Sequence, residues 1–238
     1  MKKLFMFFAA VGTTITANLA VAQEAAEVTV PLHQELKKNF IDGGPLFMTP
    51  IILCLILGLA FVIERIIYLN LADKDTKKLV SDVEDALEKG GVAAAKELCR
   101  NTRGPVASIF YQGLDRESEG IEMVEKAIVS YGGVQMGKLE SNLSWIALFI
   151  AISPSLGFLG TVIGMVQAFN AIENAGQISP TVVASGMKVA LITTVAGLIV
   201  AIFLQLFYNY ILAKIESIVN KMEDASITLV DIVIKHKK

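Results

Sequence analysis

Two of the most apolar stretches of this sequence contain hydroxyl side chains. Thr161 lies in the first stretch, at residues 141–172, and Thr194 lies in the second, at residues 181–213. If the two stretches are antiparallel helices, both hydroxyls lie roughly 20 Å from the loop at residues 173–180, at about 1.5 Å of helix per residue. Two hydroxyls at one depth can hydrogen-bond across the helices or line a file of water.

Both roles are open on the residues alone, because serine and threonine in membrane helices often bond to a neighbouring helix or to their own backbone. A proton relay also needs a titratable group, and neither stretch contains an Asp or Glu. Any carboxylate on a proton path must therefore come from a partner. Lys188 is the one charged residue of the second stretch. It lies about two turns inside the helix, from where its long side chain can reach the membrane surface.

No enzyme motif is found in the sequence, which lacks G-x-S-x-G, P-loop, H-E-x-x-H and C-x-x-C patterns. Cys54 and Cys99 form neither a metal nor a redox motif. His33 and His236 lie near opposite ends of the chain. We expect no catalytic residue, no metal site and no cofactor. The net charge of −2 gives no general attraction to nucleic acid.

The apolar residues are gathered into long blocks. Of the 238 residues, 54% are hydrophobic and 18% are charged, and about 20 apolar helical residues cross a bilayer core. We expect an all-α membrane protein with three transmembrane helices that extend into a helical domain. The helices lie at residues 46–72, 141–172 and 181–213, the domain at 73–140 and a tail helix at 214–238.

Basic residues indicate the orientation. Eleven of the 21 Lys and Arg residues lie between Arg65 and Lys138, five lie between Lys214 and Lys238, and the loop at 173–180 has none. Because basic residues concentrate in cytoplasmic loops, we expect the domain and the tail in the cytoplasm. The N-terminus and the loop then face the outside, and the chain crosses the membrane three times.

The N-terminal residues are typical of an exported protein. Residues 1–22 have a basic start, a short apolar core and a small-residue cleavage site, so we predict a signal peptide. Residues 23–45 then form a periplasmic lead. Within this lead, residues 32–41 are expected to form a short amphipathic helix, either on the membrane surface or solvated, and Gly and Pro residues end it.

Spacing and capping residues predict further helices. In the domain, Leu79, Val83 and Leu87 recur at helical spacing. Turns are expected at Gly90-Gly91 and Gly120, and a helix start at Arg103-Gly104-Pro105. Start signals for the first and third crossings are expected at Thr49-Pro50 and at Ser179-Pro180. The tail helix is expected to pack through four apolar residues, namely Ile215, Ile218, Met222 and Ile227.

Small residues predict where two membrane helices approach each other. Gly160 and Gly164 form a small-xxx-small pair in the second crossing, an arrangement that allows close contact between helix backbones. We expect Gly157 in the same helix and Gly197 in the third crossing to serve this packing as well.

Two motifs in these helices resemble a known family. Residues 153–165 (SPSLGFLGTVIGM) and 190–201 (ALITTVAGLIVA) are similar to the second- and third-helix motifs of the MotA/TolQ/ExbB proton-channel family. The Arg103-Gly104-Pro105 helix start and the three-crossing layout also match. The resemblance extends from Leu46 to Asn220 and is strongest to the ExbB branch.

The resemblance implies an inner-membrane pentamer with a single-span ExbD-like partner in its pore. An aspartate of that partner accepts the proton, and a TonB-like protein passes the energy to outer-membrane uptake. The family's pore threonines correspond to Thr161 and Thr194. Val189 stands where ExbB patterns often have a glutamate, and Lys188 beside it does not replace a carboxylate. The chain's own proton binding is therefore in question.

Three alternatives are left open. A TolQ-like subunit would energise envelope maintenance, and a membrane scaffold would conduct nothing. The transported ion, proton or sodium, is also undetermined. A four-crossing flagellar stator subunit is disfavoured because the sequence has no fourth apolar run.

Overall fold

The computed structural model describes residues 31–176 and 180–237. The predicted signal peptide at residues 1–22, the lead up to residue 30 and the predicted cap at Ser179 lie outside this part of the chain. Within it, every regular element is a helix and no strand occurs. The all-α prediction is therefore confirmed.

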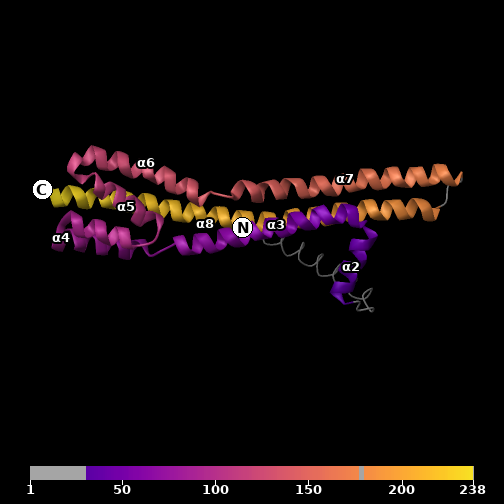
Figure 1. The fold of residues 1–238 in the computed structure, drawn as a ribbon, viewed down its shortest axis with the longest axis horizontal. Helices are drawn as coiled ribbons and strands as arrows, with labels where there is room; N and C mark the ends of the chain where they lie inside the picture. The colour runs from indigo at the N-terminus through magenta and orange to yellow at the C-terminus, as the bar shows by residue number, and fades with distance from the viewer. Residues whose placement is uncertain (1–30, 177–179, 238) are drawn as a thin grey trace, which may run out of the picture.

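Three long helices lie side by side and give the molecule its length (Figure 1). They are α3 (Pro45–Ala72), α7 (Leu143–Ala175) and α8 (Pro180–Lys237). Each is long and apolar enough to cross a membrane, so the three predicted crossings are present. The 58 residues of α8 form a helix of about 87 Å, nearly three times the thickness of a bilayer core. The predicted continuation of the third crossing into a tail helix is thus confirmed.

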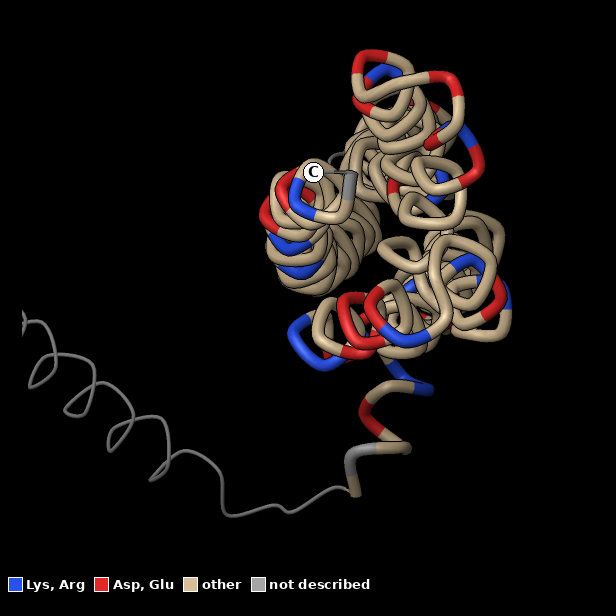
Figure 2. Tube along the Cα trace, turned by 90° about the vertical axis from the view of Figure 1, so that its left-hand side faces the viewer, with Lys and Arg blue, Asp and Glu red and all other residues tan. Residues whose placement is uncertain are grey.

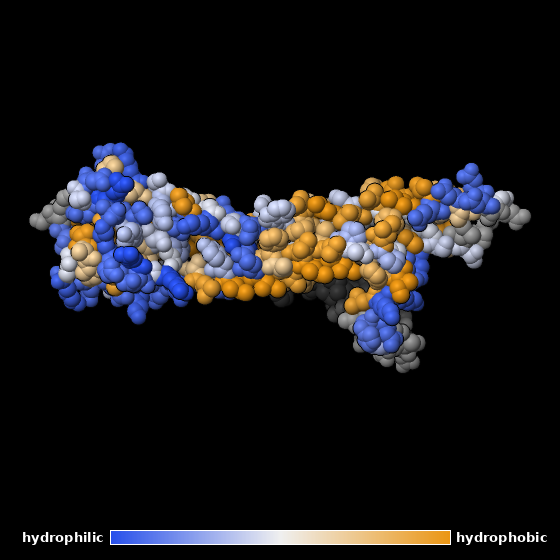
Figure 3. Space-filling model, viewed as in Figure 1, coloured by the Kyte–Doolittle hydropathy of each residue, from blue (hydrophilic) through white to orange (hydrophobic). Residues whose placement is uncertain are grey.

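The middle of the molecule has an apolar surface. Figure 3 shows a hydrophobic band between a hydrophilic end formed by the domain and hydrophilic patches at the opposite end, near the α7–α8 loop. We call these the domain end and the loop end. Large apolar side chains of the band that are exposed in the single chain include Ile56, Ile63, Phe158, Val162, Leu191, Val195, Ile199 and Ile202. A contiguous surface of this kind needs lipid or neighbouring helices to cover it.

The domain end is built from short helices around the end of α8. They are α4 (Thr76–Asn101), α5 (Pro105–Asp115), the 3-10 helix η1 (Glu117–Glu119) and α6 (Ile121–Leu139). We call these helices and α8 beyond residue 213 the helical domain. Viewed from this end, its charged residues lie on the outward faces of the helices (Figure 2).

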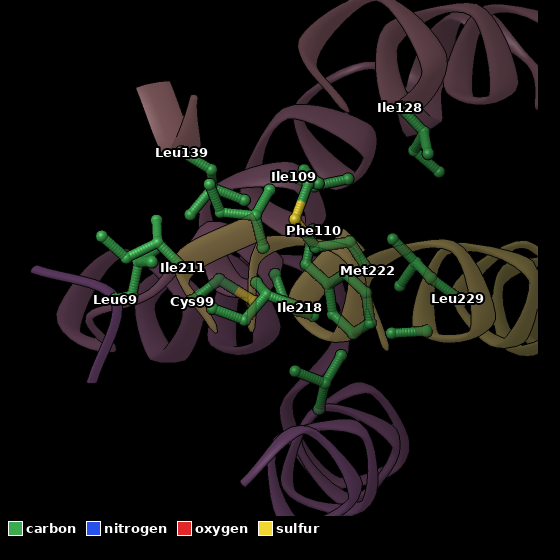
Figure 4. Packing of buried hydrophobic residues seen from close by; sticks show 14 of the residues in the cluster. Leu69, Cys99, Ile109, Phe110, Ile128, Leu139, Ile211, Ile218, Met222 and Leu229 are labelled. Atoms are coloured by element: carbon green, nitrogen blue, oxygen red, sulfur yellow. The ribbon is translucent and has the colours of Figure 1, made fainter. Parts of the chain in front are cut away.

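Apolar side chains from α4, α5 and α6 converge on α8 (Figure 4). Phe110 of α5 and Leu229 of α8 have no exposed surface, and Met222 is 4% exposed. Val83 and Leu87 are buried, as the spacing of apolar residues in α4 predicts. Ile227 is 65% exposed, so its predicted place in the packing stripe of α8 is wrong. It lies five residues beyond Met222, which turns it about 140° around the helix axis.

Glycines with positive φ form the breaks between helices. Gly91 has φ 68° and divides α4 into two arms at the predicted turn. Gly44 has φ 79° and separates α2 (Leu32–Asp42) from α3. The predicted start of the first crossing at residue 46 is within one residue of the observed one, but Thr49-Pro50 is not the entry signal, because Gly44 lets the chain turn directly into a helix with Pro45 as its first residue.

A buried arginine joins α3 to the junction of α6 and α7. Arg65 is 4% exposed, and its guanidinium bonds to Glu64 at 2.5 Å and donates to the carbonyl of Lys138 at 3.2 Å. Asn142, which has φ 64° at this junction, donates to the same glutamate at 3.3 Å. The angle at which α7 leaves the helical domain is therefore held by α3.

Asp73 holds α8 against the end of α3. Its carboxylate accepts hydrogen bonds from Lys214 at 2.5 Å and Lys221 at 2.6 Å. These bonds, that from Lys214 first, lower the pKa of Asp73 below its usual value. A lowered pKa in the folded state stabilises the fold above the unfolded value of about 3.9, and this contribution is lost as the pH falls through the folded-state value.

We therefore expect Asp73→Asn to lower the free energy of unfolding of the solubilised protein at pH 7 by about 1–2 kcal/mol, a modest loss because the ion pair is only partly buried. The measurement is the thermal denaturation midpoint, which should fall. The difference between the two proteins should shrink as the pH falls below about 4 and vanish only below the lowered folded-state pKa, where wild-type Asp73 also becomes neutral. The control is Asp85→Asn, because Asp85 and its partner Lys89 are 65% and 77% exposed. Equal midpoints for Asp73→Asn and wild type at pH 7 would contradict this role.

Candidate functional site

Helices α7 and α8 run antiparallel and are packed closely along the membrane region. A Cβ atom added at Gly160 would lie 2.5 Å from the hydroxyl oxygen of Thr193, and one at Gly197 would lie 2.5 Å from the carbonyl oxygen of Ser153. Both distances are below any normal contact. The two backbones approach this closely only because these positions have no side chain.

The same contact includes two further glycines of α7. A Cβ at Gly157 would meet the Thr193 carbonyl at 2.9 Å, and one at Gly164 would meet the Ala190 nitrogen at 3.2 Å. Gly186 belongs to the contact too, since a Cβ there would lie 2.4 Å from the Cβ of Ala168. The sequence reasoning missed Gly186. The signal was available, because Gly186 and Ala190 form a second small-xxx-small pair.

We call this close contact between α7 and α8 the seam. The side chains of Thr161 and Thr194 meet across it. Their two hydroxyl groups are in direct hydrogen-bond contact with each other. Thr161 lies 3.1 Å from the carbonyl oxygen of Ala190 on α8, and Thr194 lies 3.2 Å from the carbonyl oxygen of Gly157 on α7. The structure thus brings together the two residues that counting along the sequence put at one depth.

Each hydroxyl can also donate within its own helix. Thr161 lies 3.3 Å from the carbonyl oxygen of Gly157, and Thr194 lies 3.2 Å from that of Ala190. The cluster therefore has two hydroxyl protons and four oxygens. One proton forms the Thr–Thr bond and the other is donated to a carbonyl. Either threonine can be the donor of the Thr–Thr bond, and the two arrangements interchange without movement of the heavier atoms.

Exposure separates this pair from the other hydroxyls of the seam. Ser153 and Thr193 have no exposed surface and donate to carbonyls of their own helices, at 2.7 Å to Phe149 and at 2.9 Å to Ala190. These two serve packing. Thr161 and Thr194 are only half-buried in the single chain, so they lie at the edge of the seam.

No carboxylate lies near the threonine pair among the described residues of α7 and α8. The acidic residue of α7 is Glu173, which lies beyond the predicted crossing and is exposed near the loop end. Val189 is half-buried at the position where ExbB patterns often have a glutamate. Lys188 is 52% exposed and pairs with Asp42 at the end of α2, at 2.5 Å. Its charge is thus neutralised at the loop end, in agreement with the expected surface role.

Comparison with known proteins decides the family. A model of the MotA/TolQ/ExbB proton channel family matches residues 101–224, just over half of the chain. The chain belongs to this family. The matched region includes the threonine pair and the small residues of the α7–α8 seam.

Individual relatives carry ExbB and TolQ names. An ExbB homolog from Methanothermobacter thermautotrophicus is 34% identical over 170 residues, which cover 71% of this chain and 60% of that relative. The biopolymer transport protein ExbB of Neisseria meningitidis serogroup A is 28% identical over 193 residues, covering 74% of this chain and 86% of the relative. The Tol-Pal system protein TolQ of Pseudomonas aeruginosa is 29% identical over 142 residues, covering 59% and 57%. The family and the three apolar helices identify a multi-pass membrane protein.

Proposed function

We propose that this chain is the channel-forming subunit of a proton-driven motor in the bacterial inner membrane. Together with an ExbD-like partner, it uses the proton gradient to energise TonB-dependent uptake through the outer membrane. The half-exposed hydroxyl pair of Thr161 and Thr194 carries this proposal, because it places polar atoms at the edge of a helix seam within an apolar band.

The chemistry of the pair requires a partner. A threonine hydroxyl donates and accepts hydrogen bonds but stays neutral near pH 7, so it can orient water yet cannot hold a proton as a carboxylate does. No acidic residue of the described crossings lies near the pair. In our proposal, an aspartate on the partner's single membrane helix binds the proton, and the hydroxyls solvate the path to it.

A pentamer gives the partner its place. The exposed apolar residues on α7 and α8 provide surface for contact with neighbouring copies and with lipid. Five copies with their α7–α8 seams turned inward would form a ring of threonine pairs at one depth around the partner's helix. The helical domain then lies in the cytoplasm and the α7–α8 loop in the periplasm, as the distribution of basic residues indicates.

Reconstituted vesicles test this function. The chain is co-purified with an ExbD-like protein, reconstituted, and assayed for proton and sodium flux under a membrane potential. We expect proton flux only with both proteins, and its loss when the partner's membrane aspartate is replaced by Asn. Flux that does not change with the partner would support the non-conducting scaffold instead, and flux of sodium alone would correct the ion.

The TolQ-like role is the second candidate, and the relatives named TolQ favour it. Expression in two bacterial strains separates the roles. One strain lacks its ExbB and ExbD proteins, and the other lacks its TolQ and TolR proteins. We expect the chain and its partner to restore TonB-dependent uptake in the first strain, whereas repair of the envelope defect in the second strain alone would assign the TolQ-like role.

A further inference from the structure

A basic groove lies at the end of the first crossing, where α3, the start of α5 and the end of α6 meet. Its volume is about 380 Å³. We call it the basic groove. It is lined by Tyr68, Leu71, Ala72, Lys74, Arg103, Gly104, Pro105, Ser108, Gln135, Lys138 and Leu139.

Three cations line the basic groove. Lys74, Arg103 and Lys138 are all exposed and form no ion pair within the described residues. No acidic residue lines the groove. Asp73, beside Lys74 in sequence, is instead bound to Lys214 and Lys221. The positive end of the α5 helix, which begins at Pro105 in the groove wall, adds to the preference for an anion.

A second groove, between α4 and α8, has a different balance of charge. Its cations, Lys77 and Lys221, share the wall with Glu84 and Asp224. Of the two grooves, only the basic groove combines several free cations with the absence of acidic residues. Its charge therefore favours a ligand with at least one negative charge.

Depth places the basic groove among lipid headgroups. The Lys188–Asp42 pair marks the loop-end surface of the apolar band. About 20 helical residues from there along α3, roughly 30 Å, reach Arg65 at the opposite surface. Tyr68 lies one turn further on, inside the headgroup layer, and the Arg65 guanidinium is held 4.6 Å from the centre of its ring.

An apolar stripe leads from the basic groove into the membrane. Ile63, Ile67 and Leu71 follow at intervals of four residues, so they share one face of α3. They are 50%, 55% and 63% exposed. A ligand in the groove that also carried acyl chains would lie along this stripe, whereas a free anion would leave it uncovered.

We propose that the basic groove binds the headgroup of an anionic phospholipid. Lys74, Arg103 and Lys138 contact its phosphate, and one acyl chain follows the stripe from Leu71 towards Ile63. Clusters of Lys and Arg at a membrane surface are attracted to anionic lipids in this way. The bound lipid would fasten the junction of α3, α5 and α6 to the membrane surface. The proposal does not depend on proton conduction.

Native mass spectrometry of the detergent-purified full chain tests the site. The chain is titrated with phosphatidylglycerol or with phosphatidylcholine of the same acyl chains, with inorganic phosphate as competitor. We expect at least about tenfold stronger retention of phosphatidylglycerol by wild type, and loss of this preference in Lys74→Gln/Arg103→Gln/Lys138→Gln. The control Lys77→Gln/Lys89→Gln/Lys126→Gln removes as much charge from outside the groove and should behave as wild type.

Four results would overturn the proposal. The first is equal retention of both lipids by the wild-type chain, a result that does not depend on the folding of any variant. The second is an unchanged preference in the groove variant, and the third is an equal loss in the control variant. Displacement of the lipid by millimolar inorganic phosphate would also overturn it, because it would make a free phosphate the ligand. Thermal denaturation midpoints verify that the variants are folded.

Discussion

Replacing Thr194 by Val is expected to reduce partner-dependent proton flux by tenfold or more, while the protein still assembles with its partner. Valine has nearly the same shape as threonine but lacks the hydroxyl that contacts Thr161 and the carbonyls of Gly157 and Ala190. A lost hydrogen bond to a charged species costs about 1.5–3 kcal/mol, which corresponds to at least tenfold in rate. Flux into reconstituted vesicles measures the effect.

Assembly should survive because Thr161 keeps other acceptors. Its hydroxyl remains within 3.1 Å of the Ala190 carbonyl and 3.3 Å of the Gly157 carbonyl, so no buried donor is left without a partner. Co-purification with the ExbD-like partner and the thermal denaturation midpoint should therefore match wild type.

The neighbouring residue provides the matched control. Thr193→Val removes a hydroxyl that has no exposed surface and donates to α8's own carbonyls, so flux should persist. Thr194→Ser retains the hydroxyl and should also conduct. Normal flux in Thr194→Val would refute a pathway role for the pair. Equal losses in Thr193→Val and Thr194→Val would show that the flux depends on seam packing and not on the exposed hydroxyls.

The largest loss of stability is expected for Gly197→Ala. The added Cβ would lie 2.5 Å from the Ser153 carbonyl oxygen and 3.2 Å from the Gly157 Cα. Both are backbone atoms, so no side chain can move aside and α7 must separate from α8. Overpacking of this kind costs about 1–3 kcal/mol. We expect a lower thermal denaturation midpoint and a weaker complex with the partner on size-exclusion chromatography.

Gly133→Ala in α6 controls for the substitution itself. Nothing lies within 4 Å of a Cβ at Gly133, and alanine favours a helix over glycine by up to about 1 kcal/mol. This variant should be as stable as wild type or slightly more stable. If Gly197→Ala had the midpoint of Gly133→Ala, the close backbone contact between α7 and α8 would be refuted.

Helix positions were predictable where one local signal dominated. Apolar length located the three crossings, and helical spacing located the buried faces of α4, including Val83 and Leu87. The start of α3 was predicted to within one residue, but its entry signal was assigned to Thr49-Pro50 instead of Pro45, because the sequence has two prolines near the start. The left-handed backbone of Gly44 favours Pro45, and a φ value cannot be read from glycine's presence alone.

Contacts between distant segments needed the folded chain. Lys74, Arg103 and Lys138 line one groove, although up to 64 residues separate them in the sequence. The prediction that Ile227 packs against the helical domain failed for a related reason. The periodicity of α8 allows several apolar stripes, and only the helices packed around it select the one that contains Ala225 and Leu229.

The threonines show most clearly where sequence reasoning ends. The sequence by itself determined the depth of Thr161 and Thr194, because the rise per residue of a helix is fixed and the loop between the helices is short. Helix geometry did not distinguish Thr194 from Thr193, since the two adjacent hydroxyls differ only by about 100° around the axis of α8, and only the family resemblance pointed to Thr194. Close packing against the glycines of α7 sets that rotation. It buries Thr193 in the seam and leaves Thr194 at its edge beside Thr161.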